Sequence, residues 1–274
     1  MARQESFGRS LLVSVDARGY GAADGRRQAS FQEALVRLLD EAADRADLHR
    51  SSWRRQPAGD GELALLPPDA PEDLLIDDFV PALDRCVTRY NADLTTPARL
   101  RLRLAVHHGV AFPGANGYVG AGVVVVSRLV NCGAARRIQD AADDIGLVLI
   151  LSNRVYLDTV AQRHTHLDPT RDLVRVPVKV KEYREDAWLH VPRYRAEGLR
   201  DLLDSHPASD VGSSDPARPD VDERSDATAA PPVAAARPGE PNAWTRRYEA
   251  EVISEFHGPV KAEVIGIKKV DGRG

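Results

Sequence analysis

The feature that most constrains how this chain can fold is the stretch 99–112, RLRLRLAVHHGVAF. Its first six residues alternate arginine with leucine. Because successive side chains of a β-strand point to opposite faces of a sheet, this alternation predicts a half-buried strand. Such a strand needs neighbouring strands for its hydrogen bonds and an apolar layer to cover its buried face.

Other segments carry strand signals of the same quality. SLLVSVDA at 10–17 is an apolar, partly β-branched run, and GLVLILS at 146–152 is another. Residues 51–67 indicate a hairpin, because Gly59-Asp60-Gly61 forms a turn signal between two short runs. Residues 173–192 indicate a closing hairpin.

Helical spacing lies between these strands. Ser30 is the expected N-cap of a first helix, and Asp73 that of a second. A short helix is expected around Tyr156. The order is therefore β-α-β-β-α-β, followed by helix, strand, helix and hairpin. This order predicts the α+β class, with a ferredoxin-like core and helices on one face of the sheet.

Composition limits the classes of function. The chain has 274 residues, 43% hydrophobic and 28% charged, which is enough for one well-formed core. Its net charge of −4 gives no basic field, so we expect no nucleic-acid partner. No apolar run reaches the length of a membrane span, and the N-terminus lacks the apolar core of a signal peptide. Two distant cysteines, Cys86 and Cys132, indicate neither a disulfide framework nor a metal site. We expect a cytoplasmic protein.

The composition changes after the folded part, and we divide the chain at 8–194, 195–242 and 243–274. The middle segment holds a short helical remnant and then a stretch rich in proline, alanine, serine and aspartate, which predicts a disordered linker. The last segment is β-prone again, which predicts a separate module that contacts a protein partner.

Two aspartates are candidate metal ligands. Asp16 ends the first strand, and Asp60 lies in the tight turn of the first hairpin. Carboxylates at adjacent strand ends can share Mg²⁺, and two such ions can activate a hydroxyl and stabilise a phosphoryl leaving group. The alternative reading is ordinary turn chemistry, since aspartate and glycine are common in turns for structural reasons.

Five motifs in order resemble class III nucleotidyl cyclases over residues 8–192. They are LLVSVDARGYG, AGDGELALLP, the long stretch LRLRLAVHHGVAFPGANGYVGAGVVVVSRL, IGLVLILSNRVY and a final hairpin. That hairpin, VPVKVKEYREDAWLHVP, resembles the end of stand-alone cyclase-like proteins of actinobacteria. The resemblance implies an α+β cyclase fold and a head-to-tail homodimer, with a site for two Mg²⁺ or Mn²⁺ ions at the interface.

The resemblance also assigns residues. It implies that Asp16 and Asp60 hold the metals, with the backbone of Ala17 beside them. Arg128, from the other subunit, would stabilise the charge of the transition state. Nucleotide contacts fall at three further positions: Gln56, Gly59 and Gly117.

This chain departs from the family pattern at the positions that contact the ribose and the base. The family helix carries an asparagine four residues before its arginine, and here that residue is Val124. The base-selecting lysine and aspartate of purine cyclases correspond to Gln56 and Gly117, and the amide of Gln56 can pair with a pyrimidine edge. The resemblance also places 121–142 in one helix, despite its four valines.

Two functions therefore stay open. The first is an enzyme, slow or of altered base preference, that forms a 3',5'-cyclic nucleotide from a nucleoside triphosphate. The second is an inactive nucleotide-binding or adaptor domain that signals through residues 243–274. That tail resembles short amyloid-type signalling motifs with a Val/Ile-x-Ile-Gly core. A docked hairpin, or a strand added to a partner's sheet, is the alternative for the same segment.

His107 and His108 complete the set of candidate residues. As neighbours on a strand they point to opposite faces and cannot share one metal, so we expect structural roles. The arginine pairs at 26–27, 54–55 and 246–247 are expected on the surface, with 54–55 able to reach a triphosphate.

Overall fold

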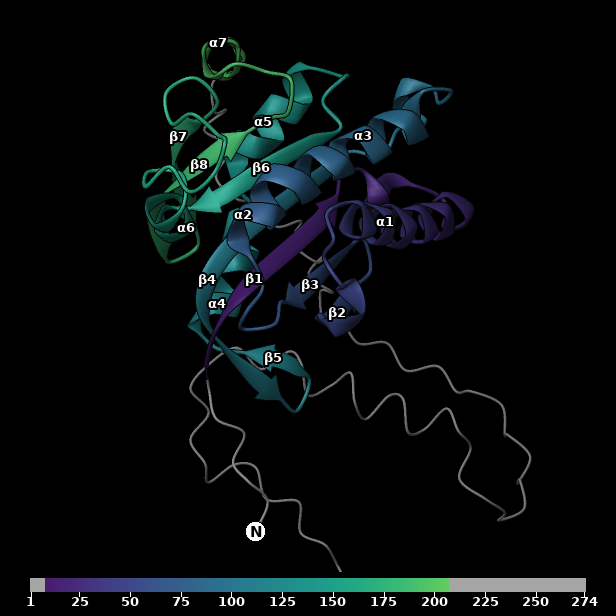
Figure 1. Cartoon of the computed structure of the whole chain (residues 1–274). Helices are drawn as coiled ribbons and strands as arrows, with labels where there is room; N and C mark the ends of the chain where they lie inside the picture. Colours follow the sequence, from purple (N-terminus) through teal and green to yellow (C-terminus); the bar gives the residue numbers. More distant parts are fainter. Residues whose placement is uncertain (1–7, 207–274) are drawn as a thin grey trace, which may run out of the picture. The chain divides into compact units, whose positions relative to one another are not determined.

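The computed structural model describes residues 8–206 and contains one mixed sheet (Figure 1). The strand order is β2-β3-β1-β4-β6-β8-β7, and the short β5 pairs with β4. The strands are β1 (Gly8–Ala17), β2 (Arg54–Ala58), β3 (Gly61–Leu65), β4 (Leu102–Gly114), β5 (Gly117–Val119), β6 (Leu147–Ser152), β7 (Val174–Val180) and β8 (Tyr183–His190). The predicted linker and tail lie outside the described residues.

The first half of the sheet is the ferredoxin-like core that the sequence predicted. Strands β2, β3, β1 and β4 pair antiparallel in that order. Strand β6 then pairs parallel with β4, and the hairpin of β7 and β8 closes the sheet on the β6 side. The α+β fold class, with its extra helix, strand and hairpin, is therefore confirmed.

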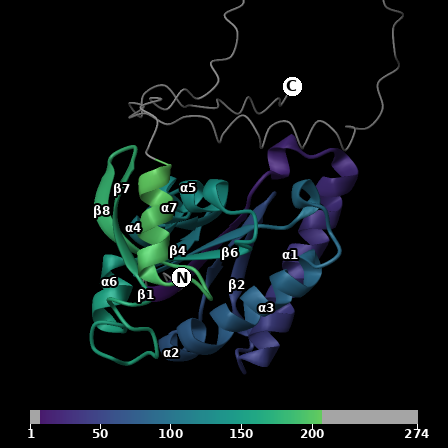
Figure 2. The same ribbon diagram turned by 90° about the horizontal axis from the view of Figure 1, so that it is seen from above.

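Helices cover both faces of the sheet, as the two views show (Figures 1 and 2). On one face, α1 and α3 pack against alternate residues of β1 such as Val13. On the other, α4, α5 and α7 pack against residues such as Leu12. The α-helices are α1 (Gly25–Arg45), α2 (Glu72–Leu74), α3 (Val80–Asn91), α4 (Ala121–Val130), α5 (Gly133–Ala141), α6 (Asn153–Asp158) and α7 (Ala196–Ser205). A short π-helix (Leu75–Phe79) joins α2 to α3.

The expectation of helices on one face alone was wrong. Strand β1 is buried on both faces, so an apolar layer is needed on each side. The predicted starts of the first two helices were also too far towards the C-terminus. Asp24 caps α1 by accepting a hydrogen bond from the backbone of Arg27, which places the start before Ser30. Asp73 lies inside the second helical segment, whose cap position is Pro71.

The predicted single helix over 121–142 is two helices. Helix α4 ends at Val130, and α5 begins at Gly133. Cys132 between them is buried and has an extended backbone with ψ 124°. The break turns the chain, so that residues after it approach the sheet from a new direction.

Helix α4 lies close to β4 because two glycines meet there. A Cβ atom on Gly122 would lie 2.9 Å from the backbone carbonyl carbon of Gly109. Real Cβ atoms do not approach a backbone so closely, so any larger residue must move the helix. Gly198 in α7 has no heavy atom within 4 Å of such a Cβ.

We expect opposite effects from alanine at these two helical glycines. Gly122→Ala should destabilise the fold by about 1–3 kcal/mol, because the added methyl overpacks the contact between α4 and β4. Gly198→Ala should stabilise it by about 0.5–1 kcal/mol, the usual gain inside an open helix. Denaturant unfolding of both variants measures the two values. Equal effects of the two substitutions would contradict the close approach.

Candidate functional site

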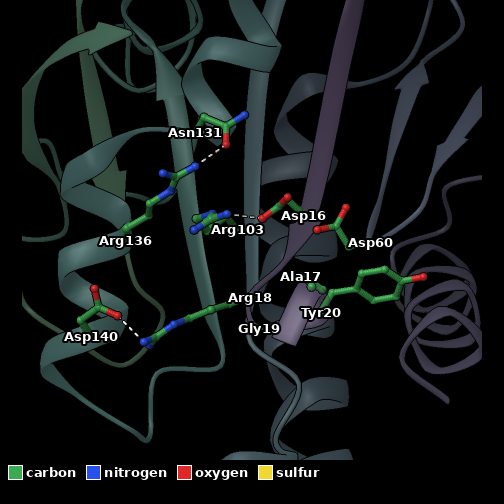
Figure 3. A pocket seen from close by; sticks show the side chains of 11 residues that line it. Asp16, Ala17, Arg18, Gly19, Tyr20, Asp60, Arg103, Asn131, Arg136 and Asp140 are labelled. Atoms are coloured by element: carbon green, nitrogen blue, oxygen red, sulfur yellow. Dashed lines mark hydrogen bonds and ion pairs between the residues drawn. The ribbon is translucent and has the colours of Figure 1, made fainter. Parts of the chain in front are cut away.

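Three neighbouring strands bring the candidate metal ligands together (Figure 3). In the register of the sheet, Asp16 of β1 lies opposite Gly61 of β3 on one side. On the other side it lies opposite Arg103 of β4. Asp60 occupies the two-residue turn just before Gly61. Pairing of the strands therefore fixes the two carboxylates beside each other, as the sequence predicted.

The turn that carries Asp60 is held by its backbone. Gly59 has φ +54°, a conformation that glycine adopts without strain. The amide of Ala17 donates to the carbonyl oxygen of Asp60 at 2.8 Å. A Cβ on Gly61 would lie 2.2 Å from the carbonyl oxygen of Val15, so the turn packs directly on β1. The predicted contact residues Gly59 and Ala17 thus shape the site through the main chain.

A pocket of 440 Å³ opens beside the two aspartates. Its walls come from the end of β1 and the loop after it, the Asp60 turn, β4, and the junction of α4 with α5. The lining residues are Asp16, Ala17, Arg18, Gly19, Tyr20, Gly21, Asp60, Arg103, Asn131, Arg136 and Asp140. Figure 3 shows Arg103 between Asp16 and Arg136, and Arg18 with Asp140 at the other end of the pocket.

Asp16 is an acid of the pocket whose surroundings disfavour its charge. Its side chain is 21% exposed and pairs with Arg103. Burial raises the pKa of this carboxyl above its ordinary value, and the nearby charge of Asp60 raises it further, while Arg103 opposes the rise. The ionised form is therefore costly in the absence of a further cation. A positive ion placed between Asp16 and Asp60 would relieve that cost.

Three arginines line the same pocket. Arg18 pairs with Asp140 and donates to the carbonyl oxygen of Gln139 at 2.8 Å. Arg103 pairs with Asp16. Arg136 donates to the side-chain oxygen of Asn131 at 2.6 Å, and no carboxylate within residues 8–206 forms an ion pair with it.

The donor set fits a hard divalent ion with an anionic ligand. Within residues 8–206 no three histidine, cysteine, aspartate or glutamate side chains group around a common point. Two carboxylates alone leave most coordination positions to water and to ligand oxygens, which is the usual arrangement for Mg²⁺ with phosphates. Both cysteines are buried, and neither lines the pocket.

Two of the predicted nucleotide contacts meet in a second cluster. The backbone amide of Tyr118 donates to the side-chain oxygen of Gln56 at 3.1 Å. Gly117 has φ +93°, and a Cβ there would lie 2.2 Å from the same oxygen. Gln56 on β2 and the β4–β5 hairpin therefore lie against each other. Neither Gln56 nor Gly117 lines the pocket of the aspartates.

The predicted catalytic Arg128 does not join the aspartates within one chain. It lies on α4 and pairs with Glu182 in the β7–β8 turn at 3.3 Å, with a side chain 21% exposed. It is absent from the lining of the pocket. Val124, one turn earlier, is 46% exposed. Arg128 and Val124, the residue that replaces the family's asparagine, thus lie on α4 outside the pocket of the aspartates.

The two histidines behave as expected for neighbours on a strand. His107 approaches α4, since its ring lies 2.6 Å from a Cβ built on Gly109 beside Gly122. Burial lowers the pKa of His107 to about 4, so its ring is neutral near pH 7. His108 lies near enough to Glu72 of α2 for its charge to lower the pKa of that acid, although burial raises it overall.

The arginines of the pocket and the asparagine beside them were not predicted from the sequence. Arg103 had a usable signal, because it alternates with buried leucines on a strand beside Asp16. Asn131 and Arg136 had none, because they reach the pocket only through the break between α4 and α5. In the part of the chain that the structure describes, no helix is long and apolar enough to cross a membrane.

Comparisons with known proteins found likenesses in structure only. No family model and no curated protein matches the chain. An adenylate/guanylate cyclase/hydrolase from Silicibacter pomeroyi is similar at 19% identity and a TM-score of 0.46, over 68% of this chain and 99% of that one. The guanylate cyclase domain of RhGC from Catenaria anguillulae, solved with GTP, shares 13% identity at a TM-score of 0.42, over 66% and 95%. A dimeric guanylyl cyclase domain from Blastocladiella emersonii shares 14% at 0.44, over 68% and 96%.

Proposed function

We propose that this protein is a nucleotidyl cyclase-like signalling protein that forms a 3',5'-cyclic nucleotide from a nucleoside triphosphate. The observation that carries the proposal is the half-buried pair of Asp16 and Asp60 beside a pocket with three arginines. Carboxylates bind divalent metal and arginines bind phosphate, so the pocket suits a metal–triphosphate complex. The order of cyclase-like motifs in the sequence supports the same reading.

Asp16 and Asp60 would hold two Mg²⁺ or Mn²⁺ ions, with the backbone of Ala17 beside them. When bound, these ions would activate the attacking 3'-hydroxyl and neutralise charge on the leaving pyrophosphate. The protein's own residues orient the phosphates. Arg103 already lies against Asp16, so its guanidinium is in reach of any anion that the metals hold. The walls of the pocket limit how the phosphate chain can lie.

The cluster of Gln56 and Gly117 would receive the base. The side-chain oxygen of Gln56 accepts from the backbone of Tyr118, so its amide NH₂ is the end that remains to meet a ligand. A donor at this place favours a base with a carbonyl oxygen at purine C6 or pyrimidine C4, as in guanine and uracil. Gly117 offers no side-chain acceptor for the amine that adenine and cytosine carry at that position. These features favour GTP or UTP over ATP and CTP as the substrate.

A homodimer would join the two clusters. Five large apolar side chains are exposed among the described residues. Three of them lie on neighbouring elements: Phe112 on β4, Val119 on β5 and Val124 on α4. Phe112 and Val119 face each other in the β4–β5 hairpin. Exposed apolar side chains that gather on one surface mark contact sites. A head-to-tail partner on this surface would bring its Arg128 towards the aspartates.

The alternative function is nucleotide binding without turnover, with signalling through residues 243–274. The observation that favours it is Val124, an exposed valine at the position where the resemblance expects an asparagine. A valine cannot hydrogen-bond the ribose. Loss of one such positioned donor lowers kcat by roughly 10²–10³-fold.

The test that separates these functions is an end-point assay with each of the four ribonucleoside triphosphates and Mn²⁺. We expect a cyclic product, detected by mass spectrometry, with GTP or UTP. Asp60→Asn should reduce its formation by roughly 10²-fold or more, since it removes a metal ligand. A triphosphate that binds in calorimetry without any product would establish the alternative. Unchanged triphosphate binding by Asp60→Asn would exclude the metal site itself.

Asp16→Asn should have opposite effects on stability and on metal binding. Because burial raises the pKa of Asp16, the folded state holds the proton more tightly than the unfolded chain does. The ionised carboxyl therefore weakens the metal-free fold as the pH rises above the ordinary aspartate pKa. In EDTA near pH 7, the melting temperature of Asp16→Asn should equal or exceed that of the natural protein. Mn²⁺ should raise the melting temperature of the natural protein only.

Because the pKa of Asp16 is raised, the stabilisation of the fold by Mn²⁺ should decrease as the pH falls. The decrease should begin at a pH above the pKa range of an ordinary aspartate. Thermal melts with and without Mn²⁺ across pH 4 to 7 measure this loss. A metal effect that stays constant down to the ordinary aspartate range would contradict the role given to Asp16.

Val119→Asp should disrupt the homodimer, because it buries an unpaired charge in the proposed contact. Light scattering after size-exclusion chromatography should give a dimer for the natural protein and a monomer for this variant. Leu157→Asp is the matched control, since Leu157 is 49% exposed against 43% for Val119 but lies on α6. Monomer formation by both variants, or by neither, would argue against this surface.

A further inference from the structure

Among residues 8–206, Arg136 is the pocket arginine that has no acidic side chain as an ion-pair partner. Of the three arginines that line the pocket, Arg18 pairs with Asp140 and Arg103 pairs with Asp16. Arg136 makes no ion pair within residues 8–206, and its hydrogen bond there is to a neutral amide. Arginine carries five N–H donors in a planar fork, so most of its donors remain available.

Asn131 holds this guanidinium in place. Its side-chain NH₂ donates to the carbonyl oxygen of Ser127 on α4 at 3.0 Å. Its side-chain oxygen accepts from Arg136 on α5 at 2.6 Å. The amide thus links the last turn of α4 to the first turn of α5 across the helix break. Since the contact uses an uncharged group, Arg136 is oriented without being neutralised.

The direction of Arg136 is into the pocket. Figure 3 shows its guanidinium beside Asn131, on the wall that faces Asp16 and Asp60 across Arg103. Its charge is among those that oppose the raised pKa of Asp16, which means that the two groups interact electrostatically. A cation so placed is poised for an anion that binds next to the carboxylate pair.

We propose that Arg136 binds the phosphate chain of the triphosphate held at Asp16 and Asp60, with Asn131 as its positioning residue. The inference rests on the proposed function, because the anion reaches this place only as a ligand of the metal site. The planar guanidinium can donate two parallel hydrogen bonds to one phosphate group. The contact lies in the same chain as the aspartates and does not need the partner subunit.

The test uses the full chain and calorimetric titration with two probes, Mn²⁺ alone and inorganic tripolyphosphate in the presence of Mn²⁺. Arg136→Gln should weaken tripolyphosphate binding by roughly 10- to 100-fold, the effect of losing hydrogen bonds between charged groups. Its affinity for Mn²⁺ alone should stay the same or rise, because a repelling positive charge is removed. Arg200→Gln is the matched control, an exposed helical arginine outside the pocket.

Asn131→Asp separates positioning from simple structural support. Aspartate keeps the acceptor for Arg136 and loses only the donor to Ser127, whereas alanine loses both, so a purely structural link would suffer less from aspartate. The new carboxylate would pair with the guanidinium, however, and should weaken tripolyphosphate binding by roughly 10-fold or more. Asn131→Ala should weaken it less, because Arg136 keeps its charge but loses its fixed orientation. Nucleoside triphosphate should follow the order seen with tripolyphosphate if the contact is to phosphate.

The outcomes separate this inference from the proposed function. Tripolyphosphate binding by Arg136→Gln equal to that of the natural protein would overturn the role of Arg136 and leave the metal site intact. Loss of both Mn²⁺ and tripolyphosphate binding in this variant would assign Arg136 to the fold. If the natural protein binds Mn²⁺ but no phosphate probe, the proposed function fails and the inference fails with it.

Discussion

The pairing of β1 with β3 on one side and β4 on the other is the constraint on which the site depends. It places Asp16 opposite Gly61 and Arg103 in one row of the sheet. A shift of one residue along β1 would turn the side chain of Asp16 towards α1 and α3 and put that of Val15 or Ala17 in its present position. The alternation of Val13, Val15 and Ala17 with the polar Ser14 and Asp16 opposes this shift, since the three apolar side chains pack in the core with α1 and α3. The hydrophobic core thus fixes the position of a charged group.

Burial of that group weakens the fold at neutral pH. The pKa of Asp16 is raised although an arginine pairs with it, so desolvation outweighs the ion pair. Residues that conflict with local stability tend to mark functional sites. The conflict at Asp16 is therefore an argument for a ligand, independent of any likeness to another protein.

Much of the fold was predictable because its signals are local. The alternation of 99–112 indicated β4, and the Gly59-Asp60-Gly61 turn indicated the hairpin of β2 and β3. The pairing of Asp16 with Asp60 followed from strand ends alone. The helix break at Cys132 was not predictable, because Val130 and Ala134 on either side continue an apolar helical pattern. Asn131 and Arg136 were missed for that reason.

The second layer of helices was missed for a different reason. Strand β1 carries apolar residues at successive positions, which indicates burial on both faces, but the order of elements did not show that the later helices cover the second face. Helix α7 follows the final hairpin and packs on α5, so only tertiary contact reveals that it belongs to the layer. Local patterns cannot show which face a late helix will cover.

The positions of the two clusters argue for a site shared between chains. Asp16, Asp60 and Arg136 line one pocket, whereas Gln56, Gly117 and Arg128 lie outside it. A nucleoside triphosphate needs contacts to its base and to its phosphates at once. In such a shared site, one subunit would supply the phosphate contacts at the end of its β1, and its partner would supply the base contacts at its β4–β5 hairpin. The exposed Phe112 and Val119 are on that same hairpin, so the surface that would bind a second chain also carries the base contacts. Dimer formation and completion of the site would then be a single event, and the concentration of the protein would control its activity.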